Sequence, residues 1–229
     1  PYDIAVFTDS AGMLGVRDLF DFYEPSTTEA IVPEGAHPAS DFSSQLFSFS
    51  SIASANKAFN REFLLQCAKV AKYSTWLGLQ CAALSQATKI VVTKRPLATL
   101  RCLPFASTGL VGARAMLDDV FSGFEEARAN FTGDDEATCG LDAAAARHLI
   151  LMVDLIRNPI ARRYCFEDAR ERGGEAIARA LAGSQLTDAE RVACKALLGE
   201  TYDAYTGYRD TLVLNDVIMK NEENLLAVG

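Results

Sequence analysis

The residues best suited to chemistry are four carboxylates on one expected helix, Asp118, Asp119, Glu125 and Glu126. Paired acids serve general acid–base catalysis when a second proton-transfer group lies beside them. The sequence places no such group near them, so they are interpreted as the solvated part of a helix. The sequence also contains no P-loop, no GxGxxG and no GxSxG motif. We therefore predict a protein with no catalytic and no cofactor-binding residues.

Cysteine and histidine residues are the next candidates, as metal ligands or nucleophiles. The chain has six cysteines, none in a CxxC pair, and only two histidines, His37 and His148. A zinc site needs several closely spaced ligands of these types, so no metal site is predicted. The cysteines are interpreted as buried small apolar residues, with one or two disulfides as the alternative in an oxidising compartment. His148 precedes the apolar run LILMV and is expected at a helix interface.

The charge of the chain argues against one class of partner. The net charge is −8 and the pI is about 4.9. Phosphate backbones repel such a chain, so nucleic-acid binding is not expected. Apolar residues make up 49% and charged residues 23%, which suits a globular protein and also a membrane protein rich in small residues.

The elements that must position these residues are expected to be helices. Residues 57–92 contain no proline and predict one long helix. Residues 97–130 predict a second helix, with Pro104 as a kink or in its first turn. Residues 136–158 predict a third helix that stops at Asn158-Pro159. The sequence has no alternating strand pattern of useful length, so the predicted fold class is all-α.

The rest of the chain flanks this helical core. Residues 1–56 are interrupted by prolines and predict an irregular N-terminal extension. Residues 159–229 predict a polar, helical C-terminal extension that is interrupted at Gly173-Gly174. A capping box of Thr187 and Glu190 starts its amphipathic helix. The predicted organisation therefore has three parts, which cover residues 1–56, 57–158 and 159–229.

Two of the expected helices suit a membrane as well as a protein core. The stretch from Tyr73 to Thr88 carries no charge, and it is slightly shorter than the roughly 20 residues that span a bilayer. In the second helix, small side chains predict close packing against partner helices. These helix-packing residues are Gly109, Gly112, Ala113 and Gly123. The alternative is a soluble domain in which the same helices form the core.

The segment around these small residues resembles the inner-membrane translocase (Tim) superfamily. In that superfamily a small-residue helix passes through an F-x-G step into a charged turn, and a Gly/Ala-rich helix follows. Residues 107–146 read STGLVGARAMLDDVFSGFEEARANFTGDDEATCGLDAAAA, with Arg128, Asp134 and Asp135 as the charged turn. Residues 71–96, AKYSTWLGLQCAALSQATKIVVTKRP, look like the first span of one branch. That branch supplies an accessory membrane subunit of mitochondrial respiratory complex I, alpha subcomplex subunit eleven.

The resemblance implies a function without catalysis and without cofactors. It implies an accessory subunit in the mitochondrial inner membrane that stabilises the membrane arm of complex I and its contacts with neighbouring complexes. Its partners would be other subunits and lipids, and its helices would pack in or against the membrane. Two alternatives remain: a component of an inner-membrane protein-import pore, and a soluble all-helical scaffold or binding domain. The third helix departs from the superfamily pattern at Asp142 and Arg147, which replace glycines.

Overall fold

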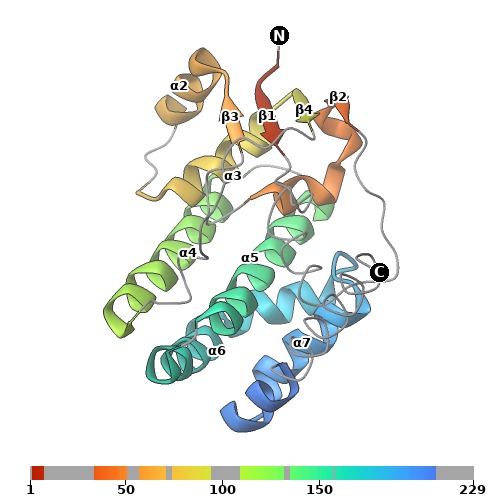
Figure 1. Cartoon of the computed structure of the whole chain (residues 1–229). Helices are drawn as coiled ribbons and strands as arrows, with labels where there is room; N and C mark the ends of the chain where they lie inside the picture. Colours follow the sequence, from red (N-terminus) through yellow and green to blue (C-terminus); the bar gives the residue numbers. More distant parts are fainter. Residues whose placement is uncertain are drawn as a thin grey trace, which may run out of the picture.

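The structure is a computed structural model that describes residues 2–7, 34–50, 57–70, 74–93, 109–131, 135–156 and 158–209. It is mostly helical, with a small sheet at one end of the helices (Figure 1). The elements are β1 (Ile4–Phe7), β2 (Gly35–Pro38), the 3₁₀ helices η1 (Ala39–Asp41) and η2 (Ser43–Phe49), β3 (Lys57–Phe59), α2 (Arg61–Val70), α3 (Trp76–Gln86), β4 (Lys89–Thr93), α4 (Leu110–Asn130), α5 (Asp135–Leu155), α6 (Pro159–Ala182) and α7 (Asp188–Gly199). Residues 202–209 form a further helical segment.

The sheet corrects the predicted all-α class. Its strand order is β2-β4-β1-β3, with β1 parallel to β4 and both outer strands antiparallel to their neighbours. The register places Ile4 beside Ile90 and Ala5 beside Ala58. Strands this short contain too few residues for an alternating pattern to stand out in the sequence. Their partners also lie far away along the chain, where local patterns carry no information.

The single long helix predicted over residues 57–92 is wrong. That stretch forms β3, α2, α3 and β4 instead. Helix α3 begins after Thr75, whose hydroxyl accepts a hydrogen bond from the Gly78 backbone N–H at 3.0 Å. It ends before Lys89–Thr93, where four successive β-branched residues favour an extended strand. In the part of the chain that the structure describes, every helix is too short or too polar to cross a membrane.

Parts of the predicted irregular N-terminal extension belong to the core. Ile4 and Val6 of β1 are fully buried, and Phe47 and Phe49 of η2 are almost fully buried. The Asp3 carboxylate links the start of β1 to the start of β4, because it accepts hydrogen bonds from the Thr88 backbone N–H and hydroxyl at 2.7 and 2.8 Å. Residues 2–7 and 34–50, the described part of this range, therefore contribute directly to the fold. The three-part division of the chain stays a prediction.

Helix α5 explains the run of alanines in the sequence. It contacts α4, α6, α7 and η2 and lies in the middle of the helices (Figure 1). Every residue from Leu141 to Val153 is buried. A helix surrounded on all sides needs small residues where its neighbours approach closely, and residues 143–146 are all alanine. The apolar runs that resemble a membrane helix form, in this structure, the centre of a protein core.

The helix boundaries after α5 were largely predictable. The predicted stop at Asn158-Pro159 is confirmed, because the Asn158 side chain accepts hydrogen bonds from the N–H groups that begin α6. The predicted capping box of Thr187 and Glu190 is also present at α7. The predicted interruption at Gly173-Gly174 is wrong, since α6 continues through it. A side chain at Gly173 would collide with Leu149, so this glycine lets α6 lie close to α5.

Helix α4 accounts for the part of the predicted 97–130 helix that the structure describes, and Pro104 lies outside the described residues. Of the four predicted helix-packing residues, Ala113 and Gly123 are buried, whereas Gly112 and Gly109, which precedes α4, are exposed. Gly123 lies against the first turn of α3. A Cβ atom there would lie 3.0 Å from both Leu77 Cβ and Thr75 Oγ1.

This close approach predicts that Gly123→Ala destabilises the fold. The added methyl group meets a Cβ atom, a capping hydroxyl and the backbone nitrogen of Gly78 at 3.1 Å, none of which can move freely. We expect a loss of about 1–3 kcal/mol in the free energy of unfolding, measured by urea denaturation. Gly199→Ala is the matched control, because nothing lies within 4 Å of its added Cβ. Equal stabilities of the two variants would contradict the close-packing interpretation.

Candidate functional site

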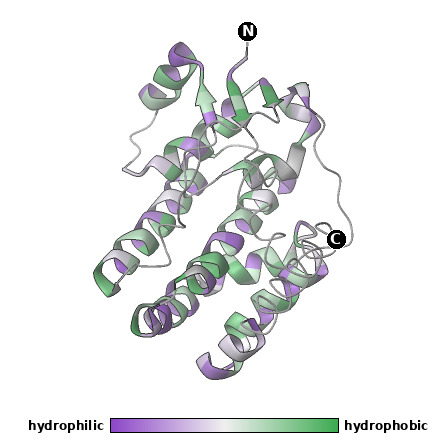
Figure 2. Ribbon diagram, viewed as in Figure 1, coloured by the Kyte–Doolittle hydropathy of each residue, from purple (hydrophilic) through white to green (hydrophobic). Residues whose placement is uncertain are grey.

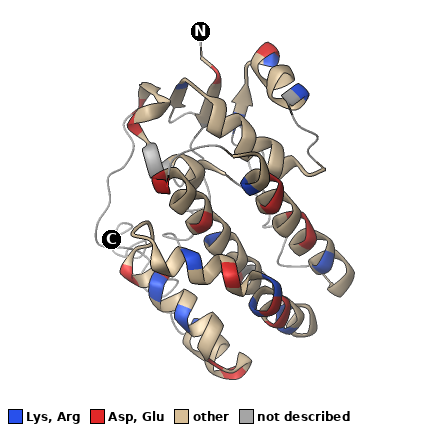
Figure 3. Cartoon of the chain, turned by 180° about the vertical axis from the view of Figure 1, so that it is seen from behind, with Lys and Arg blue, Asp and Glu red and all other residues tan. Residues whose placement is uncertain are grey.

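A cleft of about 300 Å³ opens between α4, α5 and α6. Its apolar part is formed by Val120, Phe121 and Phe124 of α4 and by Leu141 and Leu149 of α5. Such a volume is at the lower end of the range of pockets that hold small organic molecules. Its polar part comes from charged residues of the same three helices. Figure 3 shows the chain from behind, with the acidic and basic residues coloured on the ribbon. The cleft therefore combines an aromatic surface with charged groups.

The charged part centres on Asp142 of α5, whose side chain is 9% exposed. Its Oδ1 atom lies 2.5 Å from Arg128 Nη1 and 3.2 Å from Arg179 Nε. These arginines lie in the last turns of α4 and α6, and each is about 40% exposed. Two guanidinium groups from different helices thus converge on one carboxylate. A charged residue on the central helix needs such partners, because an unpaired buried charge is very costly.

A third arginine, Arg172 of α6, borders the other side of the cleft. Its guanidinium carbon lies 4.1 Å from the centre of the Phe121 ring, a cation–π contact. Its Nη1 donates to Asp118 at 2.6 Å and to Asp168 at 3.1 Å. Stacking and two carboxylates hold this guanidinium over the aromatic surface while 41% of the side chain stays exposed. The cleft can therefore present positive charge beside its apolar surface.

The arginines have donors left for a ligand. A guanidinium group carries five N–H donors in a planar fork. Arg128 contacts Asp142 through Nη1 alone, and Arg179 uses Nε for Asp142 and Nη1, at 3.7 Å, for the exposed Glu175. The remaining N–H groups can bind an anion, since carboxylate and phosphate oxygens match this fork. The arginines can therefore bind an anionic group of a ligand, as they already bind the carboxylate of Asp142.

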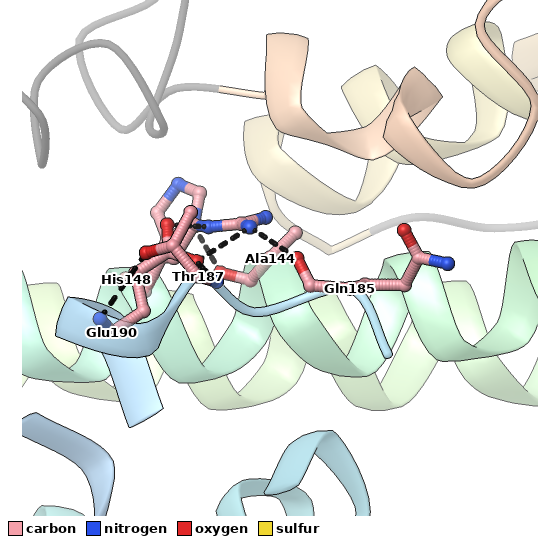
Figure 4. Close-up of polar contacts among 6 residues, drawn as sticks. Ala144, His148, Gln185, Thr187 and Glu190 are labelled. Carbon is pink, nitrogen blue, oxygen red and sulfur yellow. Dashed lines mark hydrogen bonds and ion pairs between the residues drawn. The ribbon is translucent and has the colours of Figure 1, made fainter. Parts of the chain in front are cut away.

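A second polar cluster, formed by Arg147, Gln185, Thr187 and Glu190, has a buried ion pair at its centre. Arg147 Nε lies 2.5 Å from Glu190 Oε1, and the side chains of the pair are 5% and 0% exposed. Arg147 Nη2 also donates to the Gln185 carbonyl at 2.8 Å, and the Thr187 N–H donates to Glu190 at 2.7 Å (Figure 4). This cluster joins α5 to the start of α7. Because the ion pair is buried, we assign this cluster to stability and not to binding.

Most of the described sulfur and imidazole groups that were considered for chemistry are buried. Cys81, Cys165 and Cys194 have pKa values raised to about 12 by burial, so they remain thiols at neutral pH. The five described cysteines are unpaired, and four of them are buried, as predicted. His148 is buried against the Phe124 ring, which confirms its predicted place at a helix interface. Among the described residues, no group of histidine, cysteine and acidic side chains could hold a metal ion.

The structure separates the residues of the predicted charged turn. Arg128 lines the cleft and pairs with Asp142, whereas Asp135 is exposed in the first turn of α5. Asp134 lies outside the described residues. Sequence reasoning did not identify Asp142, Arg172 or Arg179 as members of a site. One signal was present: Asp142 stands inside an apolar helix, where a charge requires a partner.

Comparisons with protein-family models, with curated proteins and with solved structures found no match.

Proposed function

We propose that the chain is a non-catalytic binding domain whose cleft between α4, α5 and α6 takes a small amphipathic carboxylate. The observation that carries the proposal is the convergence of Arg128 and Arg179 on the Asp142 carboxylate beside an aromatic surface. A carboxylate is thus the group to which both guanidinium groups already donate hydrogen bonds. This develops the binding-domain alternative drawn from the sequence.

The apolar surface limits what the ligand's body can be. Phe121, Phe124 and Leu141 offer no hydrogen-bonding side-chain atoms, so the part of the ligand beside them should be aliphatic or aromatic. Burial of that part contributes roughly 25 cal/mol per Å². The cleft carries as many acidic as basic side chains, namely Glu125, Asp142 and Glu175 against Arg128, Arg172 and Arg179. A ligand with several negative charges is therefore less suited to it than one with a single carboxylate.

The test is calorimetric titration with octanoate and 4-phenylbutyrate, with octanol and octylamine as uncharged and cationic comparisons. We expect saturable binding of the carboxylates alone. Arg179→Gln should weaken it about 10–100-fold, because charge-assisted hydrogen bonds contribute about 1.5–3 kcal/mol. Arg172→Gln tests the other side of the cleft, and Arg163→Gln is the control, since Arg163 is an exposed arginine outside it. Absence of saturable binding, or equal binding by Arg179→Gln and Arg163→Gln, would refute the proposal.

A second candidate is the accessory subunit of an inner-membrane complex, most specifically mitochondrial complex I, that the resemblance implies. One observation favours it: Gly109 and Gly112 are exposed at the N-terminal end of α4, where a partner helix could approach the backbone. The test is the mass of the native particle in mild detergent and the identity of the subunits that purify with it. Recovery of the chain as a monomer would exclude this candidate. Crosslinking to precursor chains would instead favour an import-pore component.

A further inference from the structure

The beginnings of α4 and α6 lie side by side at the end of the molecule opposite the sheet (Figure 1). The Arg114 guanidinium carbon lies 5.4 Å from the centre of the Tyr164 ring, and further along the same helices Arg172 binds Asp118. The two helices therefore run parallel and start at the same end. We call this surface, formed by Leu110, Val111, Arg114, Ile160, Arg162 and Arg163, the α4–α6 end.

This end carries the two most exposed large hydrophobic side chains of the described residues. Val111 is 84% exposed and Ile160 is 70% exposed. Val111 precedes Arg114 by three residues and Ile160 precedes Tyr164 by four, so each lies one turn nearer the helix start on the contacting face. Figure 2 shows hydrophobic residues at these lower ends of both helices. Exposed aliphatic residues that gather in one place commonly mark an interaction surface.

The charge of this end is opposite to that of the whole chain. Residues 109–117 and 158–166 contain three arginines, Arg114, Arg162 and Arg163, and no acidic residue, whereas the chain has a net charge of −8. The next acids along the helices are Asp118, which binds Arg172, and Glu167, which binds Arg163. At the nearby end of α5, Asp154 is buried against Arg209. Arg162 is half-buried, and its Nε donates to the Val153 carbonyl at 3.0 Å. Arg114 and Arg163 therefore provide the exposed positive charge beside the aliphatic side chains.

We propose that the α4–α6 end binds the surface of a membrane that contains anionic lipids. Val111 and Ile160 enter the boundary between headgroups and acyl chains, while Arg114 and Arg163, which are exposed, meet lipid phosphates. This inference does not depend on a ligand in the cleft, and it requires no helix to span the bilayer. A second copy of the chain fits less well, because the same end of that copy would bring arginines against arginines. Nucleic acid offers phosphates but nothing that suits the aliphatic side chains.

The test is co-sedimentation of the full chain with vesicles of phosphatidylcholine, alone or with about a third phosphatidylserine. We expect binding to the anionic vesicles that weakens as salt is raised. Val111→Ser/Ile160→Ser should weaken it at least about tenfold. Arg114→Gln and Arg163→Gln should each weaken it several-fold. All four side chains are exposed, so the variants should keep the fold, which circular dichroism can verify.

The matched control is Leu65→Ser/Val192→Ser, which removes two exposed aliphatic side chains elsewhere, of 46% and 47% exposure. Wild-type protein that stays unbound with anionic vesicles would overturn the proposal. So would equal binding to neutral vesicles, or an equal loss in the control variant. If the arginine variants lose binding and the Val111→Ser/Ile160→Ser variant does not, insertion of the aliphatic side chains is refuted.

Discussion

Replacing Glu190 by alanine should lower the free energy of unfolding by about 3–5 kcal/mol, because it leaves the buried Arg147 guanidinium without its counter-charge. Arg147 and Glu190 are joined by two hydrogen bonds, at 2.5 and 2.9 Å, and neither side chain is more than 5% exposed. The same carboxylate also accepts from the Thr187 N–H and completes the capping box of α7. The substitution therefore removes an ion pair and a helix cap together.

Urea denaturation of two further variants separates charge from packing. Glu167→Ala breaks an exposed pair with Arg163, in which both side chains are 62% exposed, and should cost less than about 1 kcal/mol. Arg147→Met/Glu190→Leu replaces both buried charges by apolar side chains and should recover much of the stability lost in Glu190→Ala. If Glu190→Ala is no less stable than Glu167→Ala, the buried pair does not hold α7 to α5.

The sequence correctly predicted those helix starts that depend on residues close together in the chain. The start of α6 follows from Asn158 and Pro159, and the start of α7 from Thr187 and Glu190, because capping involves residues within one turn. The apolar, alanine-rich stretch was correctly expected to be a helix. The surroundings of this helix were not predicted, since an apolar helix has the same pattern of hydrophobic residues within a protein core as in a membrane. In the structure, α4, α6 and α7 are among the elements that surround it.

Contacts between distant residues were not predictable in this way. Glu190 was recognised as part of a cap, but its ion pair with Arg147 joins residues 43 positions apart. The cleft depends similarly on Asp142 and Arg179, which are 37 positions apart. Asp142 and Arg147 depart from the glycines of the Tim superfamily pattern, and the structure gives each a charged partner. Charges inside an apolar helix thus indicated that ion pairs exist without indicating which residues complete them.

Acid should destabilise the protein through His148, and this effect should disappear when the imidazole is removed. Burial lowers the pKa of His148 to about 4, and the positive charges of Lys57 and Arg147 act in the same direction. Its Nδ1 lies 2.8 Å from the Ala144 carbonyl, and its Nε2 is buried with no hydrogen-bond partner among the described residues. The folded state therefore holds this ring neutral, although the unfolded chain protonates it near pH 6.5.

The sign of the effect follows from proton binding. Between pH 6.5 and about 4 the unfolded state binds the proton and the folded state does not, so stability is complete above pH 6.5 and falls as the pH is lowered. The loss approaches about 3 kcal/mol near pH 4. Carboxylates also titrate in this range, but their effect is common to the wild type and the His148→Leu variant and cancels when the two are compared. The unfolding free energies of both proteins are measured in urea from pH 7.5 to 4. Between these limits the wild type should lose about 3 kcal/mol more than His148→Leu. Parallel pH profiles would mean that His148 is protonated in the folded state as readily as in the unfolded chain.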